Sequence, residues 1–151
     1  MGIGAIKYAD LSQNRVSDYI FSWERMLAMQ GNTAPYLLYA YVRIRSIMRQ
    51  SESTFDAGKV LLLQENAEFE LAKFALRFGE AVETSLKDYR PNALCEYLFH
   101  LAQKFTTFYD ACPVRNSEEP LRSSRLRLCQ LIADILQRGL GLLGIETVEQ
   151  M

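Results

Sequence analysis

Apolar residues recur at intervals of three and four along most of this chain, the spacing that places side chains on one face of an α-helix. The longest such run predicts a helix over residues 93–109, which Pro113 ends. Two amphipathic segments precede it, over 65–78 and 81–89, and Gly79 is expected to bend the chain between them. The apolar face of the longest helix consists of Leu94, Tyr97, Leu98, Leu101, Phe105 and Phe108.

The segment over 65–78 has one apolar and one charged side, so we expect it to lie on the surface of a core. Its apolar side carries Phe69, Leu71, Phe74, Leu76 and Phe78, and its solvent side is expected to carry Glu65, Glu68, Glu70, Lys73 and Arg77.

A last helix is expected to begin with a side-chain cap at Ser123 or Ser124 and to run toward Leu143. The glycines expected to weaken its end are Gly139, Gly141 and Gly144.

Another helix is predicted directly after Thr33. Gly31, Asn32 and Thr33 can form a turn and cap the first backbone N–H groups, and Pro35 suits the first turn. Two stripes follow on this helix, and they predict two different roles. The stripe expected to pack into the core is Leu37, Tyr41, Ile44 and Met48, and the other is Tyr36, Tyr39, Ala40 and Arg43.

The first 30 residues predict a helix over 2–11, with Ile3 and Ile6 on one side, followed by an extended connector over 12–30. The apolar back half of this connector, Trp23, Met26 and Leu27, is expected to wedge against the helix after Thr33. A polar loop over 50–54 and an apolar-rich segment over 55–63 separate the next helices. No strand-rich region competes, so the expected fold class is an all-α helical bundle.

Composition narrows the possible partners. A chain of 151 residues with 49% hydrophobic residues is long enough for one substantial core. Its net charge of −1 gives no global positive field, so any contact with RNA must be local. No apolar run approaches the roughly 18 to 20 residues that span a bilayer. We therefore expect a soluble cytoplasmic protein without a membrane partner.

Few residues suit metal or disulfide chemistry. The three cysteines, Cys95, Cys112 and Cys129, occur singly, so a reduced compartment is favoured over a disulfide framework. His100 is the one histidine in the sequence, and we expect no metal site.

The stripe of Tyr36, Tyr39 and Arg43 has the composition of a surface that receives unstacked nucleic-acid bases. Tyrosines at helical spacing are more often half-buried core residues, so the pattern alone leaves both interpretations open.

Four blocks of sequence, in order, closely resemble the C-terminal part of the arginyl-tRNA synthetase family, which ends in a DALR-type anticodon-binding domain. The blocks run from Lys7 to Arg15, from Gly31 to Ile47, from Phe108 to Val114, and from Gly139 to Met151. The resemblance implies that residues 31–151 form the helical anticodon-binding domain. It also implies that residues 1–30 are the end of the class I catalytic half and the connector between the two.

In that family the anticodon loop contacts the first long helix of this domain and its C-terminal end. The residues implied to bind the tRNA anticodon are Tyr36, Tyr39, Ala40, Arg43, Tyr109 and Met151. The implied partners are tRNA-Arg and an upstream catalytic domain of the same protein, in a monomer. The resemblance also implies that Lys7, Tyr8, Asn14 and Arg15 join the two domains and contact the inner side of the tRNA, although packing between the domains alone would explain them as well.

The catalytic signatures of class I synthetases, a His-x-Gly-His motif and a Lys-Met-Ser-Lys-Ser loop, have no counterpart in this sequence. The resemblance therefore implies a part of an arginine–tRNA ligase whose ATP and Mg sites lie upstream, and we expect no catalytic residue, no cofactor and no aminoacylation by this chain alone. A helical protein–protein interaction module is the alternative, because the Tyr and Leu stripes could also receive a partner helix.

Overall fold

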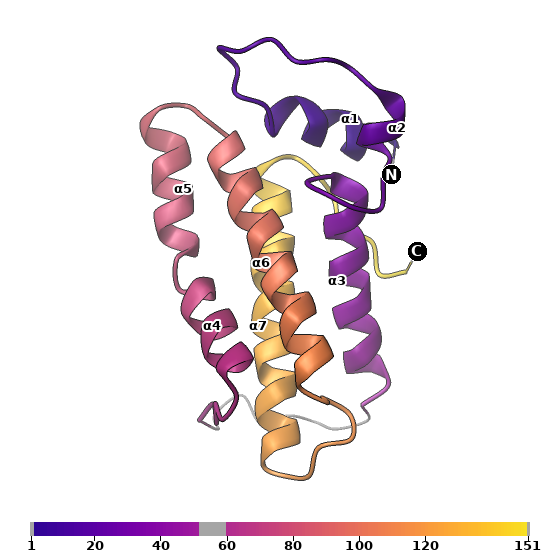
Figure 1. Cartoon of the computed structure of the whole chain (residues 1–151), viewed down its shortest axis with the longest axis vertical. Coiled ribbons are helices and arrows are strands. Elements are labelled where there is room, and N and C mark those ends of the chain that lie inside the picture. Colours follow the sequence, from indigo (N-terminus) through magenta and orange to yellow (C-terminus); the bar gives the residue numbers. More distant parts are fainter. Residues whose placement is uncertain (1, 52–59, 151) are drawn as a thin grey trace.

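Long helices that alternate in direction form the body of the molecule in the computed structural model, which describes residues 2–51 and 60–150 (Figure 1). Within these ranges all regular secondary structure is helical, which confirms the all-α prediction. The helices are α1 (Gly2–Leu11), α2 (Trp23–Met26), α3 (Ala34–Arg49), α4 (Asn66–Ala75), α5 (Phe78–Lys87), α6 (Asn92–Ala111) and α7 (Leu121–Leu142).

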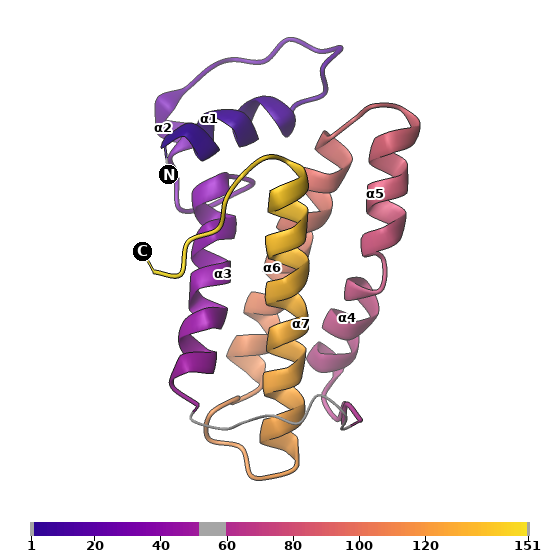
Figure 2. The same ribbon diagram turned by 180° about the vertical axis from the view of Figure 1, so that it is seen from behind.

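The bundle has four columns, because α4 and α5 follow one another along the same side (Figures 1 and 2). Both of them pack against α6, whereas α3 packs against α7 and α6. α1 crosses the end of the bundle at which α3 and α6 begin and α7 finishes (Figure 1). The predicted helical bundle is therefore confirmed, with α1 as a cover over one end.

The predicted cap and core stripe of α3 are both confirmed. The Thr33 side chain accepts a hydrogen bond from the backbone N–H of Tyr36, at 3.3 Å. Leu37, Tyr41 and Ile44 are buried in the core. Burial of this stripe fixes which side of α3 remains available to solvent.

The break between α4 and α5 lies at Leu76 and Arg77, not at Gly79 as the sequence predicted. Gly79 lies in the first turn of α5. The break lets both helices keep their contact with α6. Leu76, at the break, is 83% exposed, and Phe69, within α4, is 52% exposed, so the predicted apolar face of this segment is wrong at these two positions.

Glu68 was predicted on the solvent side and is instead completely buried. Its carboxylate accepts hydrogen bonds from the backbone N–H groups of Gln64 and Glu65, which closes the first turn of α4. It also forms an ion pair with Arg125 of α7, whose Nε lies 2.6 Å from Glu68 Oε1. Local periodicity fails here because the partner that makes burial tolerable lies far away in the sequence.

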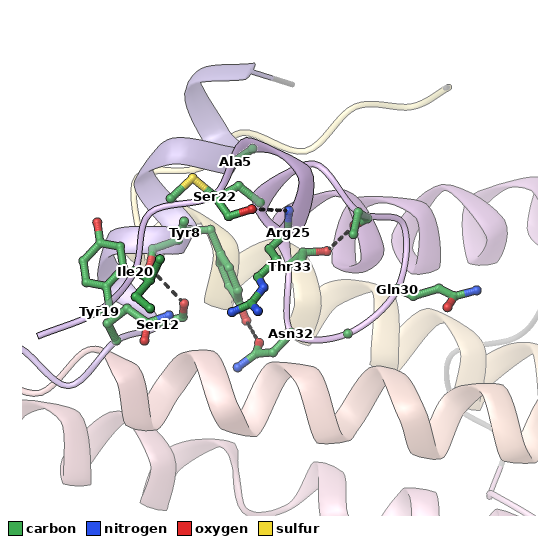
Figure 3. A pocket seen from close by; sticks show the side chains of 15 residues that line it. Ala5, Tyr8, Ser12, Tyr19, Ile20, Ser22, Arg25, Gln30, Asn32 and Thr33 are labelled. Atoms are coloured by element: carbon green, nitrogen blue, oxygen red, sulfur yellow. Dashed lines mark hydrogen bonds between the residues drawn. The ribbon is translucent and has the colours of Figure 1, made fainter. Parts of the chain in front are cut away.

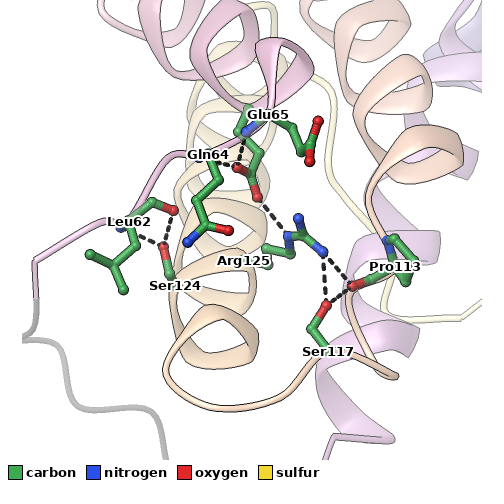
Figure 4. Close-up of polar contacts among 8 residues, drawn as sticks. Leu62, Gln64, Glu65, Pro113, Ser117, Ser124 and Arg125 are labelled. Carbon is green, nitrogen blue, oxygen red and sulfur yellow. Dashed lines mark hydrogen bonds and ion pairs between the residues drawn. The ribbon is translucent and has the colours of Figure 1, made fainter.

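Arg125 extends this buried network to the loop between α6 and α7 (Figure 4). Its guanidinium donates to the Pro113 carbonyl at 2.9 Å and to the Ser117 hydroxyl at 2.8 Å. One side chain therefore connects α4, α7 and the loop that follows α6.

The predicted serine cap of α7 is wrong, because the helix begins at Leu121. Ser123 donates through its backbone and side chain to the Glu119 carboxylate, and Ser124 exchanges hydrogen bonds with the backbone of Leu62 (Figure 4). Both serines thus bind neighbouring segments of chain.

At its other end, α7 continues through Gly139 and Gly141. The helix ends at Leu142, and Gly144, two residues later, has φ +70°. The N–H of Ile145 then bonds to the carbonyl of Leu140 at 2.9 Å, which completes a Schellman motif.

The N-terminal segment differs in two respects from its prediction. In α1 the buried residues are Ala5 and Tyr8, while Ile3 and Ile6 are exposed. The connector contains the one-turn helix α2, where we predicted extended chain, because Ser22 caps it by accepting from the N–H of Arg25. Met26 is its buried residue.

Trp23 and Leu27, which were expected to wedge inward with Met26, are exposed. Much of the predicted loop over 50–54 and of the apolar-rich segment over 55–63 lies outside the described residues. Across the described ranges, no helix combines the length and apolarity needed to cross a membrane.

Candidate nucleic-acid interface

The outer edge of α3 presents an aromatic and cationic surface. Tyr39 is 47% exposed. One turn further, the Arg43 guanidinium lies 4.2 Å from the centroid of the Tyr109 ring, which projects from α6. The structure therefore brings together two predicted site residues from different helices, in a cation–π arrangement. We call Tyr39, Arg43 and Tyr109 the α3–α6 ridge.

The other two members of the predicted stripe lie toward the core. Ala40 is 5% exposed. Tyr36 is half-buried, and its ring packs edge-to-face on Phe99 with 5.7 Å between the centroids. The four-residue stripe is thus the border between core and surface, and Tyr39 is its most exposed aromatic residue. Tyr36 and Ala40 therefore lie on the core side of the ridge.

A cavity of about 440 Å³ opens beside Tyr109. Its other lining residues are Asp110, Pro113, Val114, Arg115 and Asn116. This loop is held by the hydrogen bond from buried Arg125 to the Pro113 carbonyl. The buried ion pair therefore fixes one wall of the surface next to the ridge.

Arg125 is not among the residues predicted from the sequence, although its spacing from apolar residues indicates that it is buried. It lies three, four and seven residues before Leu128, Cys129 and Ile132, all of which are buried. An arginine on the apolar stripe of a helix needs a buried partner, and the spacing alone could have indicated this.

The C-terminal tail passes from the end of α7 to the side of α3 opposite α6 (Figure 2). Glu149 of this tail accepts from the Tyr41 hydroxyl at 3.2 Å and from Arg45 Nε at 3.1 Å. Hydrogen bonding from Arg45 holds the pKa of Glu149 below its usual value. Met151, the last predicted site residue, lies outside the described residues.

The first segment is fastened to the bundle by three of the residues expected to join domains. Lys7 Nζ donates to the Gly144 carbonyl at 2.9 Å, and Arg15 donates to the Asp88 carbonyl at 3.2 Å. Tyr8, in α1, donates its hydroxyl to Asn32 Oδ1 at 2.6 Å.

Asn14 differs from these three residues, because its side chain accepts from the N–H of Val16 in its own loop. A cavity of about 390 Å³ lies between α1, the connector and the turn before α3, with Tyr8, Arg25 and Asn32 in its lining (Figure 3).

No arrangement suited to metal binding is found among residues 2–51 and 60–150, where no three histidine, cysteine or acidic side chains cluster. His100 is exposed and lies 3.0 Å from the Gln103 side chain. The three cysteines are unpaired and buried, and burial raises the pKa of the Cys129 thiol to about 12.

Two family models match this sequence. The DALR anticodon binding domain matches residues 37–151, and the catalytic domain of class I (R) tRNA synthetases matches residues 1–23. Both matches agree with the resemblance carried by the four sequence blocks.

Similar proteins cover the whole chain. The arginine–tRNA ligases of Rippkaea orientalis and Synechococcus elongatus are each 55% identical over all of this chain, which spans 26% of their length. The arginyl-tRNA synthetase of Thermus thermophilus superposes with a TM-score of 0.88 at 32% identity, over 99% of this chain and 26% of that one. The arginyl-tRNA synthetase of Plasmodium falciparum superposes with a TM-score of 0.87 at 36% identity, over 99% of this chain and 27% of that one.

This chain thus spans about a quarter of the length of its relatives. The helical bundle, the similar proteins and the match over residues 37–151 agree, and the chain belongs to the DALR anticodon binding domain family.

Proposed function

We propose that this chain is the tRNA-recognition part of an arginine–tRNA ligase and binds the anticodon loop of tRNA-Arg. The observation that carries the proposal is the α3–α6 ridge, where exposed Tyr39 lies one helical turn from the Arg43–Tyr109 pair. An exposed tyrosine ring can stack on an unpaired base, and Arg43 can donate to a phosphate or a base edge. Tyr36, Ala40 and Met151 complete the proposed anticodon site.

The charge of the chain is consistent with this mode of binding. At a net charge of −1, affinity must come from stacking and from local cations on α3. Stacking needs no large positive field, so a domain with almost no net charge can still bind the unstacked bases of an anticodon loop.

We further propose that residues 1–30 join this domain to an upstream class I catalytic domain, which supplies the ATP and Mg sites and attaches arginine. Exposed large apolar side chains are concentrated in this segment, which is unusual for a free surface. They are Ile3, Ile6, Val16, Tyr19, Ile20, Phe21, Trp23, Leu27 and Met29. Their exposure supports the proposal that a protein domain packs against this end of the bundle.

The same apolar side chains favour the second candidate function, a protein–protein interaction module. They lie at the α1 end, whereas the ridge lies along α3 (Figure 1). The two surfaces are therefore separable by mutation, and RNA binding is assigned to α3 and the ridge rather than to the α1 end.

The test is a binding titration of the 151-residue chain with tRNA-Arg and with a tRNA-Arg of altered anticodon. Stacking of a base on tyrosine contributes about 1–3 kcal/mol, so Tyr39→Ala should weaken binding to the natural tRNA by about 5- to 150-fold. Wild type should bind the tRNA of altered anticodon more weakly than the natural tRNA, and Tyr39→Ala should weaken this binding less.

Tyr89→Ala is the matched control, because Tyr89 is 75% exposed and lies on the turn between α5 and α6. It should leave both affinities unchanged. Equal affinity for the two tRNAs in wild type would refute anticodon recognition, and self-association without RNA in gel filtration with light scattering would favour the protein–protein module.

A further inference from the structure

Two arginines of α3 hold an anion that belongs to the chain itself. The Glu149 carboxylate lies 3.1 Å from Arg45 Nε and 3.6 Å from Arg49. Arg49 also donates to the Glu149 backbone carbonyl at 3.0 Å, and the hydroxyl of Tyr41 donates to the carboxylate. Four contacts from three side chains of one helix thus converge on a single acidic residue.

The two arginines and Glu149 are accessible to solvent, whereas Tyr41 is buried. The side chains of Arg45, Arg49 and Glu149 are 32%, 42% and 58% exposed. Exposed ion pairs contribute little to stability, because water and salt screen them. An external anion can therefore compete with Glu149 without unfolding the bundle.

The position of the pair relates it to the α3–α6 ridge. Successive residues of an α-helix are turned by roughly 100°, so Arg45 and Arg49 lie on the side of α3 away from Arg43, with Tyr39 between them. The figures agree, since the tail that carries Glu149 lies on the side of α3 opposite α6 (Figures 1 and 2). An RNA strand lying across Tyr39 would pass over this pair.

We propose that Arg45 and Arg49 form a second site on α3 for an RNA backbone phosphate, and that Glu149 occupies this site until RNA replaces it. The inference rests on the proposed function and adds a contact on the other side of the ridge. A phosphate carries oxygen acceptors and a negative charge, as the carboxylate does, and it suits the same guanidinium and hydroxyl donors. Because phosphate contacts position a nucleic acid without reading its bases, this site should act equally on all sequences.

The experiment measures binding of the 151-residue chain to tRNA-Arg at several salt concentrations. Glu149→Gln removes the competing charge but keeps an acceptor for Tyr41, and it should raise affinity about 2- to 10-fold. The same gain is expected for the tRNA with an altered anticodon. Arg45→Gln/Arg49→Gln should lower affinity and reduce the slope of log K against log salt by about 0.7, the value for one phosphate of a single strand.

The decisive comparison combines these changes. Adding Glu149→Gln to Arg45→Gln/Arg49→Gln should give no gain, because the site that the carboxylate blocks is gone. Glu80→Gln is the matched control, since Glu80 also forms an exposed ion pair with an arginine, Arg77, but lies on α5. It should leave affinity unchanged.

The following results would overturn the phosphate site. Affinity that falls or stays constant in Glu149→Gln would mean that the tail supports binding or is irrelevant to it. A gain in affinity from Glu149→Gln that persists in the Arg45→Gln/Arg49→Gln variant would mean that the gain comes from the change in net charge alone. The same conclusion would follow if Glu80→Gln gave an equal gain.

The outcomes also separate the two proposals. Binding that depends on Tyr39 but not on Arg45 and Arg49 would overturn the phosphate site alone. Absence of tRNA binding in wild type would overturn both.

Discussion

Replacing Arg125 by methionine should be among the most damaging single changes in this domain. The guanidinium is the cationic partner of the Glu68 carboxylate, at 2.6 Å, and the two side chains are 6% and 1% exposed. Methionine fills much of the same space and removes the charge. The carboxylate of Glu68 then remains buried with only the N–H groups of Gln64 and Glu65 as donors.

The expected loss follows from this burial. Removing one partner of a buried ion pair costs about 3–5 kcal/mol, because the other charge is left without compensation. The total stability of a domain is about 5–15 kcal/mol, so this loss is a large fraction of it. At about 2–4 °C per kcal/mol for a chain of this size, the melting temperature should fall by roughly 6–20 °C.

Urea unfolding followed by circular dichroism measures this loss, and Arg122→Met provides the comparison. Arg122 precedes Arg125 by one turn of α7 and pairs with Glu119, but these side chains are 39% and 44% exposed. Its replacement should therefore cost much less. Adding Glu68→Gln to Arg125→Met should restore part of the lost stability, since it removes the uncompensated charge.

The same pair predicts a pH dependence. Burial alone would raise the pKa of Glu68, but the N–H of Glu65, Arg125 and the N–H of Gln64 together hold this pKa below its usual value. A lowered folded-state pKa gives stability that is present above the unfolded pKa of about 4.3 and is lost as the pH falls through the folded value. The stability advantage of wild type over Glu68→Gln should therefore shrink below about pH 4.3. The reasoning is refuted if Arg125→Met and Arg122→Met lose equal stability, or if the Glu68→Gln difference does not change with pH.

Three further predictions concern other parts of the bundle. Gly139→Ala should lower the free energy of unfolding by about 1–3 kcal/mol, because the added methyl group would lie 2.5 Å from a methyl of buried Leu98. At Gly141 an added methyl group meets open space, so Gly141→Ala should be neutral or stabilising in the same urea assay. Tyr89→Gly should raise the melting temperature, since Tyr89 has φ +52° and is 75% exposed, so glycine relieves a left-handed backbone and loses few contacts; a lower melting temperature would contradict this. The Cys129 thiol, whose pKa burial raises to about 12, should resist a thiol reagent at pH 8 until urea unfolds the chain, and rapid reaction in the native state would contradict the burial.

The sequence predicted those parts of the fold that depend on local spacing. The α3 stripe of Leu37 and Ile44, the Thr33 cap and the apolar face of α6 follow from helical periodicity and from backbone groups close by in the chain. These features are correct because each can be read within one or two turns of helix.

The errors occur where a distant partner reverses the local preference. Glu68 resembles a solvent residue until Arg125 is known to face it, 57 residues away. Ser124 resembles a cap until Leu62 is placed beside it. In both cases the local sequence gives the side chain its polarity, but only the packed bundle shows which polar group lies opposite.

The predicted RNA-binding residues divide along the same line. Tyr39 can be recognised from helical spacing, but Tyr109 comes to lie against Arg43 only through the packing of α3 on α6. Glu149 had no local signal at all, because its partners Arg45 and Tyr41 precede it by 104 and 108 residues. The resemblance to a family predicts the site residues, and the fold adds the order in which these residues lie across α3. Arg43 and Tyr109 lie on one side, Tyr39 lies in the middle, and Arg45 and Arg49 with their internal anion lie on the other. In the binding mode we propose, a strand that crosses α3 meets the stacking groups and the phosphate site in succession. Substitutions on the two sides should therefore differ in their dependence on anticodon sequence and on salt.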